Sequence, residues 1–398
     1  MRKSLFIVTA YMFFCKFIPV IPYYALFLQQ AKRFETSQVL VFFSLYGIGV
    51  MLFEIPCGFF ADRYGVKSSI ITGHLFRLLS IIILIFSQYY EAILLTQLVL
   101  ACGDALISGS EETYFFSFYH DNEQIFTEKK YSFEVFTAKL HSINWFGIAL
   151  SFFTGSLCAY FTLIVPFTVT AGIYFLCIIL SFLLRTVTYD KKENRKRILV
   201  MPVLHEIIHS KKLLSWALIV TLVGNSLSVA YLLIQPMMNE YRFSGTVNGA
   251  LFGCATLCAS CGAYFESVVF SQSERRRNIG ILALFFALII CSILIAYNTS
   301  FILFFILFCL FRFIFGIFSP LLAARTNRLI STNTYRTAII SILSLASGIV
   351  QATLLLVTAH IGKASVAAKF TFLNAFMGIA FIVICYILLR TRNTKTTK

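Results

Sequence analysis

The sequence predicts an all-α integral membrane protein whose twelve transmembrane helices form two pseudo-symmetric bundles of six. Hydrophobic residues make up 59% of the 398 residues and charged residues only 13%, and the mean hydropathy is +0.84. The 44 phenylalanines are more than a water-soluble surface can hide, whereas lipid accepts apolar side chains on every face of a helix. The apolar residues also fall into runs of about 20, the length of an α-helix that spans a bilayer.

Twelve such runs follow one another, and each ends where polar or basic residues interrupt the apolar pattern. The first follows Arg2 and Lys3 and lacks a small-residue cleavage site, so we expect it to be kept as a helix. The predicted helices cover residues 5–29, 38–61, 68–88, 92–117, 140–161, 163–186, 213–238, 246–270, 279–297, 301–323, 337–360 and 367–389.

The longest interruption, residues 187–212, is polar and basic and contains Pro202. It divides six predicted helices from six, so we expect an N-terminal bundle over 1–186, a cytoplasmic linker over 187–212 and a C-terminal bundle over 213–398. A faint internal repeat agrees with this division, because Gly262 and Glu266 repeat the spacing of Gly58 and Asp62 roughly half a chain later.

The formal net charge is +16, and the basic residues lie almost entirely in the segments between apolar runs. Lysine and arginine concentrate on the cytoplasmic side of membrane proteins, and an even number of helices puts both termini on that side. We therefore expect a multi-pass protein of the cell membrane with cytoplasmic termini, and no segment suggests nucleic-acid binding. The 11 cysteines lie within apolar runs, which predicts free thiols, and we expect a monomer without a cofactor.

The segment from Glu54 to Lys67 joins the second and third predicted helices. Gly58 is expected to permit close helix contact and Gly65 to form the turn, while charged residues stand where the chain leaves the lipid. Glu54 and Pro56 precede this pattern. The segment resembles the loop signature of the major facilitator superfamily, in a branch of bacterial members, through Gly58, Asp62, Arg63, Gly65 and Lys67.

Two further stretches are similar to the same branch. Residues 108–112, with sequence Ser-Gly-Ser-Glu-Glu, resemble its fourth helix, and Arg336 with Thr337 and Ala338 resembles the start of its eleventh. The resemblance implies a transporter that works by alternating access between two bundles. It also implies that Asp62 meets the region of Arg336 and holds the inner gate shut, because the N-terminus of a helix attracts negative charge.

Ionisable side chains within the predicted spans are the candidate substrate and proton pathway, because each is costly in lipid unless it is paired or hydrated. They are Lys16, Glu54, Arg77, Asp104, Glu111, Glu112 and Arg312. Helical rise places Lys16 about 17 Å and Asp104 about 20 Å above the inner boundary, and the other charges of the first half at roughly 8–14 Å. We therefore expect Lys16 to pair with Asp104, and Arg77 with the glutamates; purely structural ion pairs are the alternative.

These features predict a secondary active transporter that exports a small amphiphilic compound or a short antibiotic-like peptide in exchange for protons. Asp104 is the predicted proton carrier, and Arg312, which has no obvious acidic partner, is predicted to bind an anionic group of the substrate. The sequence holds no glycine-rich phosphate loop, so ATP is not the expected energy source. Uptake of a small nutrient by the same fold is the alternative direction.

One enzyme class must be weighed against transport. His205, Glu206 and His209 match the pattern of zinc proteases, with two histidines four residues apart and a glutamate able to act as base. The pattern lies in the predicted linker and has no credible third ligand, so we interpret it as accidental. Cys254, Cys258 and Cys261 share one helical face, where small residues predict close packing rather than a metal site.

Overall fold

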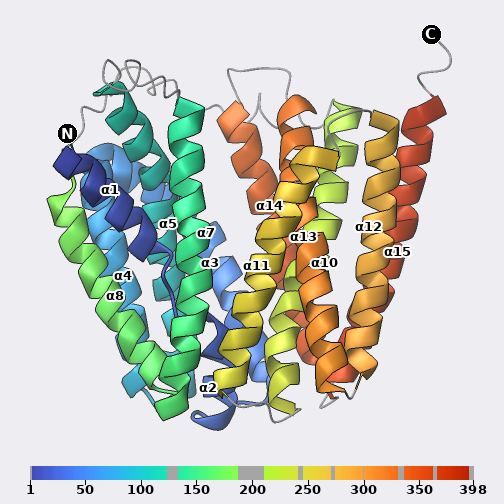
Figure 1. Ribbon diagram of the computed structural model, residues 1–398, viewed down its shortest axis with the longest axis horizontal. Coiled ribbons are helices and arrows are strands. Elements are labelled where there is room, and N and C mark those ends of the chain that lie inside the picture. Colours follow the sequence, from blue (N-terminus) through green and yellow to red (C-terminus); the bar gives the residue numbers. More distant parts are fainter. Residues whose placement is uncertain are drawn as a thin grey trace. The chain divides into compact units, whose positions relative to one another are not determined.

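The computed structural model describes residues 2–122, 133–186, 210–240, 245–269, 274–298, 300–329, 336–361 and 365–393 (Figure 1). All regular structure in these ranges is helical. Ten helices within them are long and apolar enough to cross a membrane, and two shorter apolar helices cover Lys3–Cys15 and Leu345–His360. The predicted all-α membrane architecture is therefore confirmed.

The chain divides into two compact units. The first contains Met1–Glu35, Val41–Lys196 and Phe243–Gly253; the second contains Thr36–Leu40, Arg197–Arg242 and Cys254–Lys398. Helices of the first half are α1 (Arg2–Cys15), η1 (Ile21–Tyr23), α2 (Tyr24–Gln30), α3 (Thr36–Tyr64), α4 (Val66–Phe86), α5 (Tyr90–His120), α7 (Phe133–Phe161) and α8 (Val165–Leu183). Helices of the second half are α10 (Lys211–Glu240), α11 (Gly245–Val269), α12 (Glu274–Tyr297), α13 (Phe301–Leu329), α14 (Arg336–His360) and α15 (Val366–Asn393).

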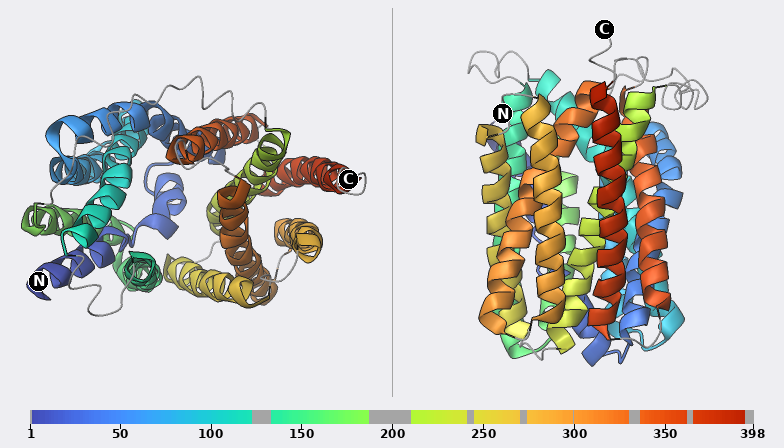
Figure 2. Two further views of the ribbon diagram at one scale, coloured as in Figure 1. Left: turned by 90° about the horizontal axis from the view of Figure 1, so that it is seen from above. Right: turned by 90° about the vertical axis from the view of Figure 1, so that its right-hand side faces the viewer.

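Each unit is held by long helices that run side by side. In the first unit α4 packs along both α5 and α8. In the second unit α15 packs along α10 and α12, and Figure 2 shows α12 and α15 next to each other. The predicted linker over 187–212 falls almost entirely outside the described residues, so the predicted division at that segment stays a prediction.

The first predicted helix, over 5–29, is wrong as a continuous element. α1 ends at Cys15, residues 16–20 are non-helical, and the chain resumes as η1 and α2. The physical cause is the pair Pro19 and Pro22, because proline lacks the backbone N–H and its ring clashes with the preceding turn. Lys16 therefore follows the last residue of a helix that ends partway along the predicted span.

The turn between α3 and α4 is a single residue, Gly65, whose φ is +92°. Glycine adopts this conformation without the steric cost that a Cβ imposes, so the predicted turn role of Gly65 is confirmed. Gly58 differs from its prediction. It is exposed, and no described atom lies within 4 Å of the position its Cβ would take, so the expected close helix contact is absent there.

Close contacts occur at other glycines. A Cβ on Gly73 of α4 would lie 2.5 Å from the Ile107 side chain and 2.7 Å from the Gly103 carbonyl of α5. In the second unit Gly262 of α11 meets the Phe313 carbonyl of α13. The three cysteines of that helical face are free thiols; Cys254 and Cys258 are half-buried, whereas Cys261 is exposed.

Candidate functional site

The charged site of the first unit begins where α4 and α5 approach each other most closely. The glycine contact between Gly73 and Gly103 lets the two backbones come together, and Arg77 and Asp104 lie just beyond it. Arg77 Nε donates to Asp104 Oδ1 at 2.5 Å, and the Tyr46 hydroxyl of α3 donates to Oδ2 at 2.7 Å. Both oxygens of Asp104 therefore accept a hydrogen bond.

Glu111, two turns further along α5, forms a second centre. Its Oε1 accepts hydrogen bonds from the Tyr11 hydroxyl at 2.7 Å and from the Cys15 thiol at 2.9 Å. Its Oε2 faces Lys16 Nζ at 3.8 Å, an ion pair longer than a hydrogen bond. The Lys16 side chain is 35% exposed and that of Glu111 only 9%.

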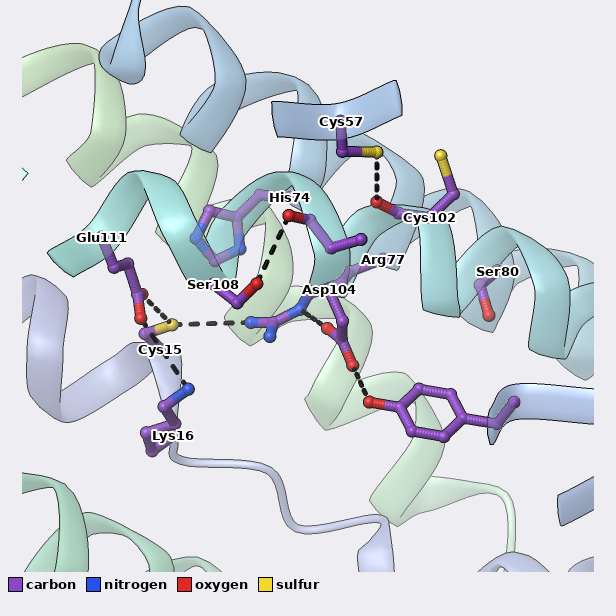
Figure 3. Close-up of polar contacts among 12 residues, drawn as sticks. Cys15, Lys16, Cys57, His74, Arg77, Ser80, Cys102, Asp104, Ser108 and Glu111 are labelled. Atoms are coloured by element: carbon purple, nitrogen blue, oxygen red, sulfur yellow. Dashed lines mark hydrogen bonds and ion pairs between the residues drawn. The ribbon is translucent and has the colours of Figure 1, made fainter. Parts of the chain in front are cut away.

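Cys15 joins the two centres. Arg77 Nη1 lies 3.5 Å from the Cys15 sulfur, which itself donates to Glu111 (Figure 3). The figure shows the Arg77 head group pointing between Asp104 and Cys15, with Lys16 below Cys15 and Glu111. The four charges cancel when both carboxylates are ionised, so this buried group needs no further counter-ion in that state.

These contacts correct the predicted partners. Lys16 pairs with Glu111, and Arg77 pairs with Asp104. Estimates of depth could not decide which basic residue pairs with which carboxylate. Because α5 continues to His120, Lys16 and Arg77 both lie at depths between those of Asp104 and Glu111. The deciding factor is which helix faces meet, and the α4–α5 glycine contact brings Arg77 to Asp104.

His74 belongs to this site and was not predicted. It is fully buried on α4, three residues before Arg77, and its Nε2 lies 3.1 Å from the Tyr11 hydroxyl. The single proton of Tyr11 is donated to Glu111, so Nε2 must donate to Tyr11, and Nδ1 is then an acceptor without a partner among the described residues. The signal that could have found His74 is its spacing of one helical turn from Arg77.

Two buried cations lie in the described part of the second unit: Lys369 of α15, which donates to backbone carbonyls of α14, and Arg312, whose setting is different. Arg312 of α13 is 8% exposed, and its guanidinium carbon lies 4.6 Å from the centre of the Tyr231 ring and 5.1 Å from that of Phe315. Aromatic rings at this distance stabilise a cation but do not neutralise it. In the described ranges Arg312 makes no ion pair, and its Nε has no hydrogen-bond partner.

Comparison with known proteins identifies the family. The model of the Major Facilitator Superfamily matches residues 5–333. The chain belongs to the major facilitator superfamily. It is thus a transporter and not an enzyme, and the zinc protease alternative has no support; His205, Glu206 and His209 lie outside the described residues. Within the ranges that the structure describes, no three potential ligands gather at a metal site.

Individual relatives agree with this family. The chain is 27% identical over 234 residues to the uncharacterized MFS-type transporter YxaM of Bacillus subtilis (strain 168), a match that covers 56% of this chain and 55% of that one. The chain thus matches about half the length of this curated relative. The crystal structures of the nucleoside transporter NupG and its D323A mutant share the fold, with TM-scores of 0.75 and 0.76 at 12% identity, covering 98% and 96% of this chain and 99% and 98% of theirs.

The remaining predicted residues of this facilitator lie in varied settings. Glu54 is half-buried and forms no ion pair with a described residue, and the Arg63 guanidinium packs on the ring of Tyr64. Lys67 donates to the carbonyls of Phe182 and Leu184, at 2.8 and 2.7 Å, which end α8. The side chains of Glu112, Asp62 and Arg336 lie outside the described residues, so the expected gate contact stays a prediction.

Proposed function

We propose that this major facilitator superfamily transporter couples the movement of a small amphiphilic compound or short peptide to the proton gradient and exports it. The observation that carries the proposal is the distribution of buried charge. In the first unit two carboxylates and two cations balance one another, whereas in the second unit Arg312 has no acidic partner in the described ranges.

Proton coupling rests on the carboxylates Asp104 and Glu111. Adding one proton to either leaves an unpaired positive charge in the site, so the protonated and ionised states differ in which ligands they stabilise. Glu54 and Glu112 are further acids of the proposed proton pathway. Such a difference is what a transporter needs if proton binding is to control substrate binding.

Substrate binding rests on Arg312. Its guanidinium is permanently charged and presents N–H groups in a planar fork suited to a carboxylate or phosphate. The rings of Tyr231 and Phe315 beside it offer an apolar surface for the rest of an amphiphilic molecule. A substrate with an anionic group and an apolar body fits these contacts.

The gate at the inner ends of the helices is proposed to involve Gly58, Asp62, Arg63, Gly65 and Lys67 together with Arg336. The α4 residue Lys67 already ties this turn to the end of α8. The family resemblance implies that Asp62 faces the start of the helix at Arg336, because the N-terminus of a helix attracts negative charge.

The energy source is tested by collapsing the proton gradient. Cells with and without the protein are loaded with a panel of fluorescent amphiphilic carboxylates, and accumulation is followed with a protonophore added while ATP is maintained. Export should stop when the gradient is lost. Undiminished flux would contradict proton coupling.

Direction is tested by the same measurement. Lower accumulation in cells that contain the protein supports export, whereas higher accumulation supports uptake. Uptake is the second candidate, and NupG, a nucleoside transporter of the same fold, makes nucleosides a sensible addition to the panel.

A further inference from the structure

We infer that Glu111 is the carboxylate that takes up the coupling proton, and that this proton replaces Lys16 as the partner of Glu111. The inference rests on the proposed proton coupling and identifies the group that performs it. It departs from the expectation that Asp104 carries the proton. The reason lies in the different partners of the two carboxylates.

Asp104 has no oxygen without a hydrogen bond. Oδ1 accepts from Arg77 and Oδ2 accepts from Tyr46, and a guanidinium offers only donors. A proton on either oxygen would remove the negative charge that compensates Arg77. Arg77 is buried and cannot lose its own proton, so it would remain as an uncompensated charge.

Glu111 has such an oxygen. Both of its hydrogen bonds converge on Oε1, from Tyr11 and Cys15, and Oε2 makes no hydrogen bond with a described residue. A proton that binds Oε2 leaves those two bonds in place. The proton removes only the ion pair with Lys16, whose Nζ is 3.8 Å from Oε2.

Lys16 can lose this partner at lower cost than Arg77 can lose Asp104. Its side chain is 35% exposed, against 6% for Arg77, so Lys16 is less enclosed by protein than Arg77 is. The proton comes from the aqueous phase and no covalent bond other than O–H forms. Lys16 keeps its charge, and the site gains one positive charge.

Tyr11 and His74 are positioning residues in this scheme. Tyr11 holds Oε1 and is itself held by His74, so the free oxygen Oε2 is turned toward Lys16. The described titratable and charged groups around Glu111 are Tyr11, Cys15 and Lys16 from α1 and the break after it, His74 and Arg77 from α4, Asp104 on α5 and Cys177 from α8.

The inference is tested by infrared difference spectroscopy of the purified protein in liposomes, with pH as the only variable. Glu111→Gln should remove the C=O band of a protonated carboxylic acid that titrates in the wild type, and Asp104→Asn should keep it. Gln retains the acceptor oxygen for Tyr11 and Cys15, so the variant preserves the local packing. Loss of the band in Asp104→Asn but not in Glu111→Gln would overturn the inference.

A matched pair of tyrosine variants gives a second test in which both carboxylates remain. Tyr11 and Tyr46 donate equivalent bonds of 2.7 Å to Glu111 and to Asp104. Tyr11→Phe removes a donor to the ionised form of Glu111 and should raise the midpoint of the band by about one pH unit, whereas Tyr46→Phe should leave it in place. A shift only in Tyr46→Phe, or in neither variant, contradicts the inference.

Glu91→Gln serves as the control, since Glu91 is exposed on the same helix. The C=O band of Glu91, which is identified by its loss in Glu91→Gln, should have the same midpoint in Tyr11→Phe as in the wild type. These spectra report which carboxylate titrates whether or not transport needs protons. A failure of proton coupling is seen separately, in the experiment with the protonophore.

Discussion

At the scale of single residues, we expect the ion pair between Arg77 and Asp104 to stabilise the first unit. Arg77 is buried, and Asp104 is its only described acidic partner. The ion pair between Glu111 and Lys16 is different, because its two atoms are further apart and the Lys16 side chain is partly exposed. The two pairs therefore have different consequences when they are broken.

Asp104→Asn should lower the stability of the folded protein by about 3 kcal/mol, because it leaves a buried guanidinium without a counter-charge. Thermal unfolding in detergent measures this loss, with Glu91→Gln on the same helix as the control. Equal melting temperatures for the two variants would show that Arg77 finds another partner.

Arg312→Lys should weaken binding of an anionic amphiphile by about tenfold or more, because the point charge is kept while the planar fork is lost. Equilibrium binding of a fluorescent carboxylate found in the transport panel measures the effect. The exposed Arg185→Lys is the control. Unchanged affinity in Arg312→Lys would place the anion site elsewhere.

At the scale of helices, glycines decide where neighbours approach. Gly73 and Gly103 bring α4 against α5 and so place Arg77 beside Asp104, whereas Gly172 of α8 has open space around it. The prolines after Cys15 end α1 early and leave Lys16 outside the helix. Local backbone features thus position each of the charges.

Gly73→Ala should destabilise the protein, since the new methyl group would meet the Ile107 side chain at 2.5 Å and the Gly103 carbonyl at 2.7 Å. Gly172→Ala should be neutral or stabilising by about 0.5–1 kcal/mol, because alanine is the better helix former. The melting temperatures of the two variants, compared with that of the wild type, test both expectations. A tolerated Gly73→Ala would mean that α4 and α5 can separate without loss.

At the scale of the whole molecule, topology remains to be measured. The concentration of basic residues predicts cytoplasmic termini and a cytoplasmic segment at 187–212. In a cysteine-free background, Glu193→Cys should resist a membrane-impermeant maleimide added to intact cells, whereas Gln30→Cys, at the exposed end of α2, should react. Labelling of Glu193→Cys from outside would show that the orientation is opposite to the predicted one.

The amino-acid sequence by itself determined the helical membrane class, most of the spans, the turn at Gly65 and most of the charges within the spans, although it missed the buried Lys369, because hydropathy and glycine geometry are local properties. Only the tertiary structure decided that Lys16 faces Glu111 and Arg77 faces Asp104, that His74 joins them, and that Gly73 rather than Gly58 forms the close contact. Charge pairing depends on how each helix is rotated and how closely it packs. Those quantities are set by contacts between segments far apart in the chain.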